Sequence, residues 1–494
     1  MAAVISFFCG LISLGGEILW VRLFGFANES TPRAFGFVLF CYLIGIALGA
    51  ELGKKACVAN NAENMIHKII WIFVLSSLTW IAFPFAYGLV VHTPLHFSVG
   101  VVAMIASAAI IAYMFPMVHH LGAVPGENQG KKFSKVYVCN VVGAGLGPLL
   151  VGWYLLDKFT LHQSFLILAI VALLFALWLM LWQKPKALWA PLMLGIAVFC
   201  AWQQSDMWLL QNISVKRTHL KYVDENKHGM TTIFSDPVQG DMVFGGNVYD
   251  GRTNLNGDIN SNGLHRVLVA GLLKPKPKRV LMVGLSVGTW LALVREFEGI
   301  ETLDAVEINP GYAKLITHYP DQAAALSDPR VNVVFDDARR WLRLHPEKKY
   351  DLIVMNSTWH WRSNTTLLLS QNFFEQLKTH MMPGAVMAFN STYSQDAFYT
   401  AYHVFGNAYR LNNFVYASDH SLKEMFFREE NIQWLRGFKV NGNPIFSRNS
   451  DVPEKILDMP FVAYRDVSSS FERESELITD ENMLPEFKYG KKLF

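Results

Sequence analysis

The first 200 residues contain the feature that most restricts the fold, a series of long apolar segments separated by short polar loops. A helix needs about 20 apolar residues to cross the hydrocarbon core of a bilayer. The first segment has no basic region before it and no small-residue cleavage site after it, so we expect a retained helix rather than a signal peptide. Six segments reach the required length, near 3–25, 33–53, 66–91, 98–118, 136–156 and 163–182, and a shorter one lies near 187–202.

The composition agrees with a membrane protein that also carries a soluble part. Of its 494 residues, 52% are hydrophobic and only 17% are charged, a low share for a soluble enzyme. A formal net charge of +3 without a basic block does not indicate a nucleic-acid partner. The five cysteines form no CxxC pair, so we expect neither a metal site nor a disulfide framework.

The distribution of lysine predicts how the chain crosses the membrane. Alternate loops are rich in lysine, and the loops between them hold little more than Arg33 and Lys158. The positive-inside rule places the lysine-rich loops and the amino terminus in the cytoplasm. Six crossings return the chain to the cytoplasm, whereas a seventh, at 187–202, would place the following domain outside. We expect this short segment, which contains Pro191, to be interfacial or re-entrant. The lysine-rich loops lie at 54–68, 119–135 and 183–187.

The apolar segments contain one pair of charged residues and one pair of closely spaced glycines that carry predictions. Glu17 and Arg22 share one segment, and charges at membrane depth are costly unless paired or functional. Five positions apart, they occupy different helix faces, so each is predicted to need a partner on another helix. Alternatively, Arg22 reaches the headgroups and Glu17 is a structural acceptor. Gly143 and Gly147, four residues apart, are predicted to let two helices approach closely.

Residues 278–391 show strands alternating with helical stretches. An apolar run at 280–283 precedes Gly284 and Gly288, and a turn of this kind places a nucleotide against the amides of the next helix. The next strand ends in Glu307, where an acid can hydrogen-bond ribose hydroxyls. The alternative for Glu307 alone is an ordinary solvated strand end.

Two more strands extend the pattern. The third ends in Asp336 and Asp337, and the fourth ends in Asn356. Four strands with polar carboxyl ends predict a doubly wound sheet with a nucleoside-binding crevice along one edge. After residue 391 we expect one helix and one further strand.

Five motifs carry a family resemblance: VGLSVGTW, VEINPGY, LSDPRVNVVFDDARRWL, YDLIVMN and LLLSQNFFEQLKTHMMPGAV. With them, residues 249–391 resemble the spermidine-synthase-like family, and more specifically its membrane-fused bacterial branch. The resemblance implies a Rossmann-type methyltransferase fold. It also implies that S-adenosylmethionine or its decarboxylated form is bound as a substrate.

The resemblance also implies roles for single residues. Glu307 would hold the ribose, and Asp337 would face the adenine with Asp336 beside it. Asp250, in a small β-subdomain before the nucleotide fold, would lie near the entrance of the active site; the alternative is a hairpin turn at Asp250–Gly251. The residues on the amino-acid side of the nucleoside would be Gly284, Ser286 and Gly288.

The sequence departs from this family at three positions that carry acids. Asn356 replaces the acid that takes a proton from the attacking amine, and an amide cannot act as a base near neutral pH. Trp359 replaces a second acid that holds the diamine, and Val287 replaces the glycine-loop acid that meets the amino group of the nucleoside. His360 remains as the titratable group of the fourth-strand loop, with packing as its alternative role.

These observations predict a transmembrane helical domain (1–204), a small β-subdomain (205–265), a Rossmann-type domain (266–420) and a C-terminal extension (421–494). The chain is expected to be a multi-pass protein of the bacterial inner membrane, with its soluble domain in the cytoplasm. The predicted function is group transfer to an acceptor other than putrescine, and the alternative is a non-catalytic nucleoside-binding or transport-coupled module. Expected partners are a small-molecule substrate and the lipid bilayer, and homodimerisation is left open. The acidic residues Asp480, Glu481 and Glu486 are expected to form a solvated tail.

A reporter enzyme fused after residue 215 tests the predicted topology. We expect cytoplasmic reporter activity, because the lysine-rich loops flank the sixth crossing on the cytoplasmic side. Periplasmic activity would show that the 187–202 segment crosses the membrane.

Overall fold

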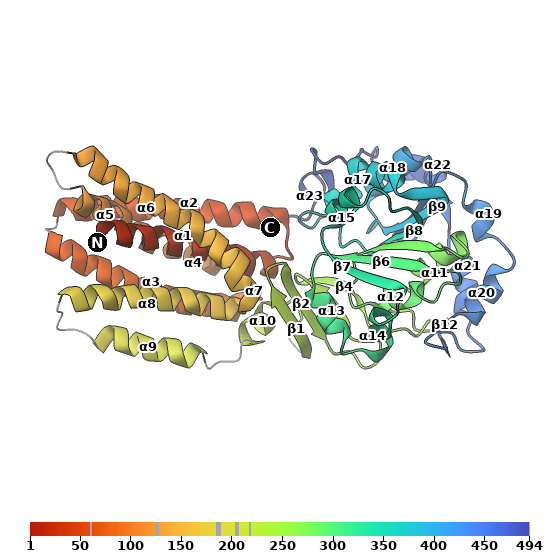
Figure 1. The fold of residues 1–494 in the computed structure, drawn as a ribbon, viewed down its shortest axis with the longest axis horizontal. Coiled ribbons are helices and arrows are strands. Elements are labelled where there is room, and N and C mark those ends of the chain that lie inside the picture. Colours follow the sequence, from red (N-terminus) through yellow and green to blue (C-terminus); the bar gives the residue numbers. More distant parts are fainter. Residues whose placement is uncertain (60–61, 124–127, 184–188, 203–206, 217–218, 494) are drawn as a thin grey trace. The chain divides into compact units, whose positions relative to one another are not determined.

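The chain divides into two compact units, which are described one at a time (Figure 1). The helical unit comprises Met1–Thr218 and Glu225–Gly229, and the α/β unit comprises His219–Asp224 and Met230–Phe494. The domain boundary predicted at residue 204 and most of the lysine-rich 183–187 loop lie outside the described residues, and the other predicted boundaries stay predictions. This computed structural model describes residues 1–59, 62–123, 128–183, 189–202, 207–216 and 219–493.

Six helical segments of the helical unit are long and apolar enough to cross a membrane, counted within the described ranges. They confirm the six segments predicted from the sequence, by length and composition. The fourth segment combines α4 with α5, and the fifth combines α6, a π-helical turn and α7. The helices are α1 (Ala2–Ala27), α2 (Pro32–Ala59), α3 (Ala62–Val90), α4 (His96–Ala112), α5 (Met114–Gly122), α6 (Gln129–Leu149), η1 (Leu150–Leu155), α7 (Leu156–Lys158) and α8 (Leu161–Gln183).

The shorter apolar segment forms α9 (Trp189–Trp202), and α10 (Met207–Ile213) follows it. The 14 residues of α9 correspond to roughly 21 Å of helix. This length is less than the hydrocarbon core of a bilayer, about 30 Å. The residues on either side of α9 lie outside the described ranges, so whether this segment crosses the membrane stays a prediction.

Glycines bring the backbones of α1 and α6 into direct contact. A Cβ atom at Gly143 would lie 1.9 Å from the carbonyl oxygen of Phe7, and one at Gly147 would lie 2.4 Å from that of Leu11. Near the same contact, the Asn140 amide donates to the Ser6 carbonyl oxygen at 2.9 Å. The predicted close approach at Gly143 and Gly147 is therefore confirmed, and its partner is α1.

Arg22 is bound by main chain rather than by another helix. Its Nη2 donates to the carbonyl oxygens of Asn226 at 3.2 Å and Lys227 at 2.7 Å. Both belong to Glu225–Gly229, which is part of the helical unit and forms the tip of the hairpin between β1 (Leu220–Asn226) and β2 (Gly229–Phe234). The prediction of a partner on another helix was wrong for Arg22, because carbonyl oxygens of a turn satisfy the guanidinium equally well.

The α/β unit begins with a four-stranded sheet in the order β1-β2-β3-β4, where β3 is Met242–Gly245 and β4 is Val248–Arg252. The short strands predicted here are present. The β3–β4 turn lies at Gly246 and Asn247, so Asp250 lies within β4 and not in a hairpin turn.

An eight-stranded mixed sheet forms the centre of this unit, in the order β14-β10-β11-β9-β8-β5-β6-β7. The four strands predicted as a parallel set are β8, β5, β6 and β7, and β9 pairs parallel to β8. The single strand expected after residue 391 is an antiparallel hairpin, β10 with β11. The bounds are β5 (Arg279–Val283), β6 (Thr302–Glu307), β7 (Val331–Phe335), β8 (Tyr350–Met355), β9 (Met381–Asn390), β10 (Asn407–Leu411), β11 (Phe414–Ser418), β14 (Val462–Ala463) and, in a separate pair, β12 (Lys439–Val440) with β13 (Asn443–Pro444).

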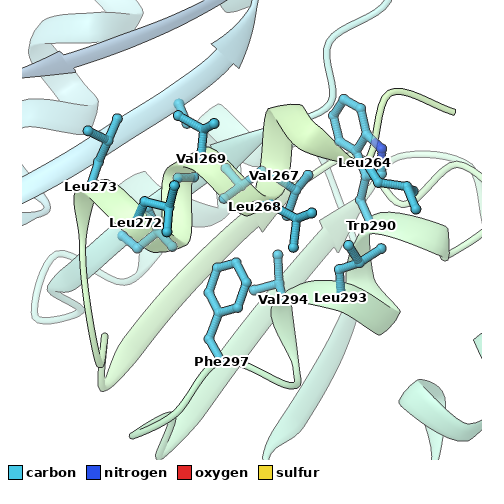
Figure 2. Packing of buried hydrophobic residues seen from close by; sticks show 14 of the residues in the cluster. Leu264, Val267, Leu268, Val269, Leu272, Leu273, Trp290, Leu293, Val294 and Phe297 are labelled. Carbon is cyan, nitrogen blue, oxygen red and sulfur yellow. The ribbon is translucent and has the colours of Figure 1, made fainter. Parts of the chain in front are cut away.

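Helices cover both faces of the large sheet. The side chains of β5 alternate between two apolar clusters, which is why its sequence is a continuous apolar run. One cluster includes α11 (His265–Leu273) and α12 (Thr289–Val294), whose apolar side chains are drawn in Figure 2. The other includes α15 (Ala338–Leu344), α17 (Gln371–Thr379) and α18 (Gln395–Phe405). The remaining helices are α13 (Gly311–Ile316), α14 (Pro320–Leu326), α16 (Thr366–Leu369), α19 (Lys423–Phe426), α20 (Asn431–Gly437), α21 (Val452–Leu457), α22 (Tyr464–Val467), η2 (Ser468–Ser470) and α23 (Leu484–Phe487).

Two of the three acidic C-terminal residues, Asp480 and Glu486, are held by the protein and not by solvent, which corrects the prediction for them, whereas Glu481 is exposed. The Asp480 carboxylate accepts from both terminal nitrogens of Arg339, at 2.9 and 2.6 Å. Glu486 is 1% exposed and accepts from the backbone amides of Asn364 and Thr366. A carboxylate can be buried when such donors replace its water. The donors lie far from Asp480 and Glu486 in the sequence, so the residue pattern of the C-terminal segment gave no sign of these contacts.

We expect Gly143→Ala to destabilise the helical unit by about 1–3 kcal/mol, the usual cost of overpacking a tight contact. Thermal unfolding of the full-length protein in detergent measures the effect. Gly145→Ala is the matched control, because a Cβ there meets nothing within 4 Å. Equal unfolding temperatures for the two variants would contradict the close approach of α1 and α6.

Candidate active site

A glycine turn follows β5 and opens the candidate site. Gly284 has φ +86°, and a Cβ atom on it would lie 2.8 Å from the Asn356 carbonyl oxygen. A side chain at this position would be strained by both the dihedral angle and the contact. The turn ends at Gly288, which precedes the first residue of α12. The turn predicted from the sequence is therefore present, next to the carboxyl end of β8.

Glu307 lies at the carboxyl end of β6 and is only 5% exposed, so it is not a solvated strand end. Its carboxylate accepts from the backbone amide of Leu285 at 2.7 Å and from that of Asn309 at 2.8 Å. Burial raises the pKa of Glu307 to about 7, although the two amides act in the opposite direction. The carboxyl group is thus fixed beside the glycine turn by two main-chain donors.

Asp250 meets the glycine turn from the small sheet. Its carboxylate accepts from the Tyr312 hydroxyl at 2.7 Å, and its carbonyl oxygen accepts from the Ser286 hydroxyl at 3.2 Å. Burial raises the pKa of Asp250, while Tyr312 and the Arg362 guanidinium lower it. The negative charge of Asp250 also raises the pKa of Glu307. Asp250, Ser286 and Glu307, three of the predicted residues, therefore lie together.

Val287 is 1% exposed and packs in an apolar cluster with Ile233, Val243, Tyr312 and Leu315. A carboxylate here would be placed among aliphatic side chains of the small sheet and α13 at a high desolvation cost. The departure from the family at this position therefore fits the surrounding packing.

The loop after β8 carries the remaining predicted catalytic residues. The Asn356 backbone amide donates to the Val283 carbonyl oxygen at 2.8 Å, which fixes its backbone beside the glycine turn. The Thr392 hydroxyl lies 2.7 Å from Nδ1 of His360 and accepts from its backbone amide. Burial lowers the pKa of His360, so its imidazole is neutral near pH 7. Trp359 is partly exposed, with its ring centre 6.2 Å from that of Trp361.

Asp336 and Asp337 follow β7 and organise the start of α15. The Asp337 carboxylate accepts from the backbone amide of Arg340 as the helix cap, and Asp336 pairs with the Arg340 guanidinium. The Asp336 amide donates to the Glu307 carbonyl oxygen, so the two strand ends are adjacent. Helix capping explains why an acid stands at 337, and a ligand role for it stays a prediction.

Sequence reasoning missed four residues that lie at the site. Ile308 follows β6 and Phe335 ends the adjacent strand β7. Ile308 exposes 56% of its surface and Phe335 exposes 49%, and the sequence pattern of a strand end does not reveal this exposure. Arg362 acts electrostatically on Asp250, and Glu486 holds the loop of His360 through the amides of residues 364 and 366. Both contacts arise only from tertiary structure.

Within the described residues, no three His, Cys, Asp or Glu side chains form a group that could hold a metal ion. A cavity of about 770 Å³ lies elsewhere in the α/β unit, between the loop at 255–258 and the C-terminal residues 436–448. None of the predicted site residues lines this cavity. The strand ends, and not the cavity, therefore define the candidate site.

The α/β unit is similar in sequence to known proteins. The family profile of the spermine/spermidine synthase domain matches residues 265–408. Polyamine aminopropyltransferase 1 of Streptomyces coelicolor is 24% identical over 302 residues, which are 58% of this chain and 56% of that protein. Spermine synthase of Arabidopsis thaliana is 33% identical over 112 residues, which are 22% of this chain and 31% of that protein.

A polyamine aminopropyltransferase of Alkaliphilus oremlandii is 36% identical over 85 residues, 17% of this chain and 30% of that protein. The chain thus spans about half the length of the first of these relatives and about a third of the other two. The solved spermidine synthase of Thermotoga maritima aligns with a TM-score of 0.39 and 16% identity, over 49% of this chain and 85% of that one.

The matched residues include the glycine turn, Glu307, Asp336, Asp337 and Asn356, and they extend from the start of α11 into β10. The C-terminal part of this chain therefore contains a spermine/spermidine synthase domain.

Proposed function

We propose that this chain is a membrane-anchored group transferase that uses S-adenosylmethionine or decarboxylated S-adenosylmethionine and delivers the transferred group to an acceptor other than putrescine. The six apolar helices would anchor it in a bacterial inner membrane, with the α/β unit in the cytoplasm, where such nucleosides are made.

The buried Glu307 carboxylate is the observation that carries this proposal. It stands at the end of the second parallel strand, beside a glycine turn, where ribose hydroxyls can donate to an acid. A carboxylate that is 5% exposed and paired only with main-chain amides in the described structure suits a ligand with two further hydroxyl donors.

Two exposed apolar side chains support a nucleoside at the same edge. Phe335 pairs in register with Glu307 across β6 and β7, and Ile308 follows Glu307 directly. Both expose about half of their surface, Phe335 at the end of the edge strand β7 and Ile308 directly after β6. A flat adenine ring would cover this apolar surface.

The chemistry requires little from the protein beyond alignment. The acceptor atom attacks the carbon bonded to the positively charged sulfur. The carbon–sulfur bond breaks. Its electron pair stays on the sulfur, which becomes a neutral thioether. The acceptor then loses a proton to a base or to water. Positioning supplies most of the acceleration in such a displacement.

The absence of three acids that the resemblance implies argues against an ordinary diamine site. Val287 is buried in an apolar cluster, Asn356 cannot take a proton, and Trp359 offers an indole in place of a carboxylate. His360 and Asp250 remain as groups that could accept a proton from a different acceptor.

The second candidate is a nucleoside-binding or transport-coupled module without turnover. The observation that favours it is Asn356, because the family places its proton acceptor there. Product formation from a radiolabelled nucleoside distinguishes the two functions, since a binding module would retain the ligand without releasing product.

Glu307→Ala tests the nucleoside site. We expect the variant to bind S-adenosylmethionine and its decarboxylated form more weakly by about 1–3 kcal/mol, the range for leaving hydrogen-bonding groups unpaired. Isothermal titration of the full-length protein in detergent measures both affinities. Glu301→Ala, on the exposed residue before the same strand, is the matched control. Unchanged affinity in a folded Glu307→Ala protein would exclude this assignment.

We expect no measurable spermidine from putrescine and decarboxylated S-adenosylmethionine. Asn356→Asp alone should not restore the activity, because Trp359 and Val287 still lack the carboxylates that would hold the diamine and the nucleoside amine. Removal of a general base costs about 10²–10⁴-fold in rate. The assay must therefore detect rates that far below those of a normal synthase.

The matched control for this assay is Glu307→Ala, which should show the same background. Spermidine formed by the unmodified protein above that background would contradict the prediction. It would indicate that His360 or Asp250 takes the proton in place of the missing acid.

A further inference from the structure

Arg266, the second residue of α11, has a guanidinium group without a protein partner. Its Nε is buried and donates to no atom in the part of the chain that the structure describes. Gly263 covers this edge of the group, since a Cβ atom at residue 263 would lie 2.9 Å from both Nε and Cζ of Arg266. The terminal nitrogens are therefore the donors that a ligand would meet.

The charge of Arg266 is not balanced by a nearby carboxylate. Burial lowers the pKa of Arg266, and the groups that act against this shift are the hydroxyls of Tyr416, Tyr249 and Tyr393. A guanidinium withdrawn from water without an acid costs free energy, and native proteins retain such groups mainly where a ligand supplies the charge. The surroundings of Arg266 thus indicate an anion that is not part of the protein.

The neighbours of Arg266 place it at the candidate site. Tyr249 is adjacent in sequence to Asp250, and Tyr393 follows Thr392, the residue that holds His360. Asn262, four residues before Arg266, accepts a hydrogen bond from the backbone amide of Arg252, at the end of β4. Arg266 therefore lies among the segments that carry both remaining proton acceptors.

A second arginine faces the same region from the opposite loop. Arg362 follows His360 by two residues, donates to the Thr358 hydroxyl at 2.9 Å, and acts electrostatically on Asp250 and Tyr312. A cationic diamine would meet two guanidinium groups here, and the acids that would attract it are absent at positions 356, 359 and 287. Beside the acids Asp250 and Glu307, the site therefore carries two arginines and lacks three acids that a diamine site of the resembled family would have.

We propose that the acceptor carries an oxyanion, either a carboxylate or a phosphate, and that Arg266 binds it. This inference rests on the proposed transferase function and names the chemical class of its acceptor. The planar guanidinium matches the two oxygens of a carboxylate or phosphate in a bidentate pair, which a lysine cannot form.

Binding of matched small amines tests the proposal. Putrescine and 4-aminobutyrate have the same chain length but differ in one end group, and phosphoethanolamine supplies the phosphate. Each is titrated into the full-length protein, with and without methylthioadenosine. We expect at least one of the two anionic amines to bind about 10- to 100-fold more tightly than putrescine, the range for a charge-assisted hydrogen bond. The tighter anionic amine identifies the head group.

Variants distinguish binding of the anionic amine by Arg266 from a general effect of the protein's positive charge. Arg266→Gln should remove the preference for the anionic amine while leaving the affinity for methylthioadenosine within about twofold, and Arg266→Lys should retain part of the preference. Arg343→Gln, on an exposed arginine of α15, is the control and should change neither value.

Putrescine affinity equal to or above that of both anionic amines would overturn the proposal, even if the variants failed to fold. An unchanged preference in Arg266→Gln would also overturn it. Loss of methylthioadenosine binding in the unmodified protein would count against the transferase function alone, since the titrations without nucleoside still report the selectivity for the oxyanion.

Discussion

Two backbone amides, those of Leu285 and Asn309, hold the Glu307 carboxylate at the end of β6. The Leu285 amide points to it only because Gly284 turns the chain with a positive φ, close to the Asn356 carbonyl oxygen. The ends of β5, β6 and β8 are therefore fixed by one arrangement of main-chain groups. This main-chain arrangement also fixes the positions of the side chains that could touch a nucleoside.

The C-terminal segment holds the loop that follows β8. It lies outside the matched synthase domain, yet Glu486 holds the amides of residues 364 and 366 and Asp480 holds Arg339. Glu486 therefore holds the end of the loop that carries Asn356, His360 and Arg362, and Asp480 holds α15 through Arg339.

The charged side chains are where this site departs from the family that its sequence resembles. A carboxylate at position 287 would be placed in an apolar cluster, and positions 356 and 359 hold an amide and an indole. The Arg362 guanidinium acts electrostatically on Asp250, and the Arg266 guanidinium lies among Tyr416, Tyr249 and Tyr393. The proposed preference for an oxyanion acceptor depends on this difference in charge, because a desolvated charge favours an opposite partner.

The sequence by itself determined the long apolar helices, the parallel strands and the glycine turn with its acid, because each depends on a local pattern of apolar residues or on one turn. The close approach of α1 and α6 was also predictable from Gly143 and Gly147. Only the tertiary structure decided which groups meet: Arg22 with a hairpin turn, Glu486 with the fourth-strand loop, and Arg266 with tyrosines and no acid. These contacts join residues up to about 200 positions apart, and burial and hydrogen bonding of a polar side chain depend on its distant neighbours rather than on the residues beside it.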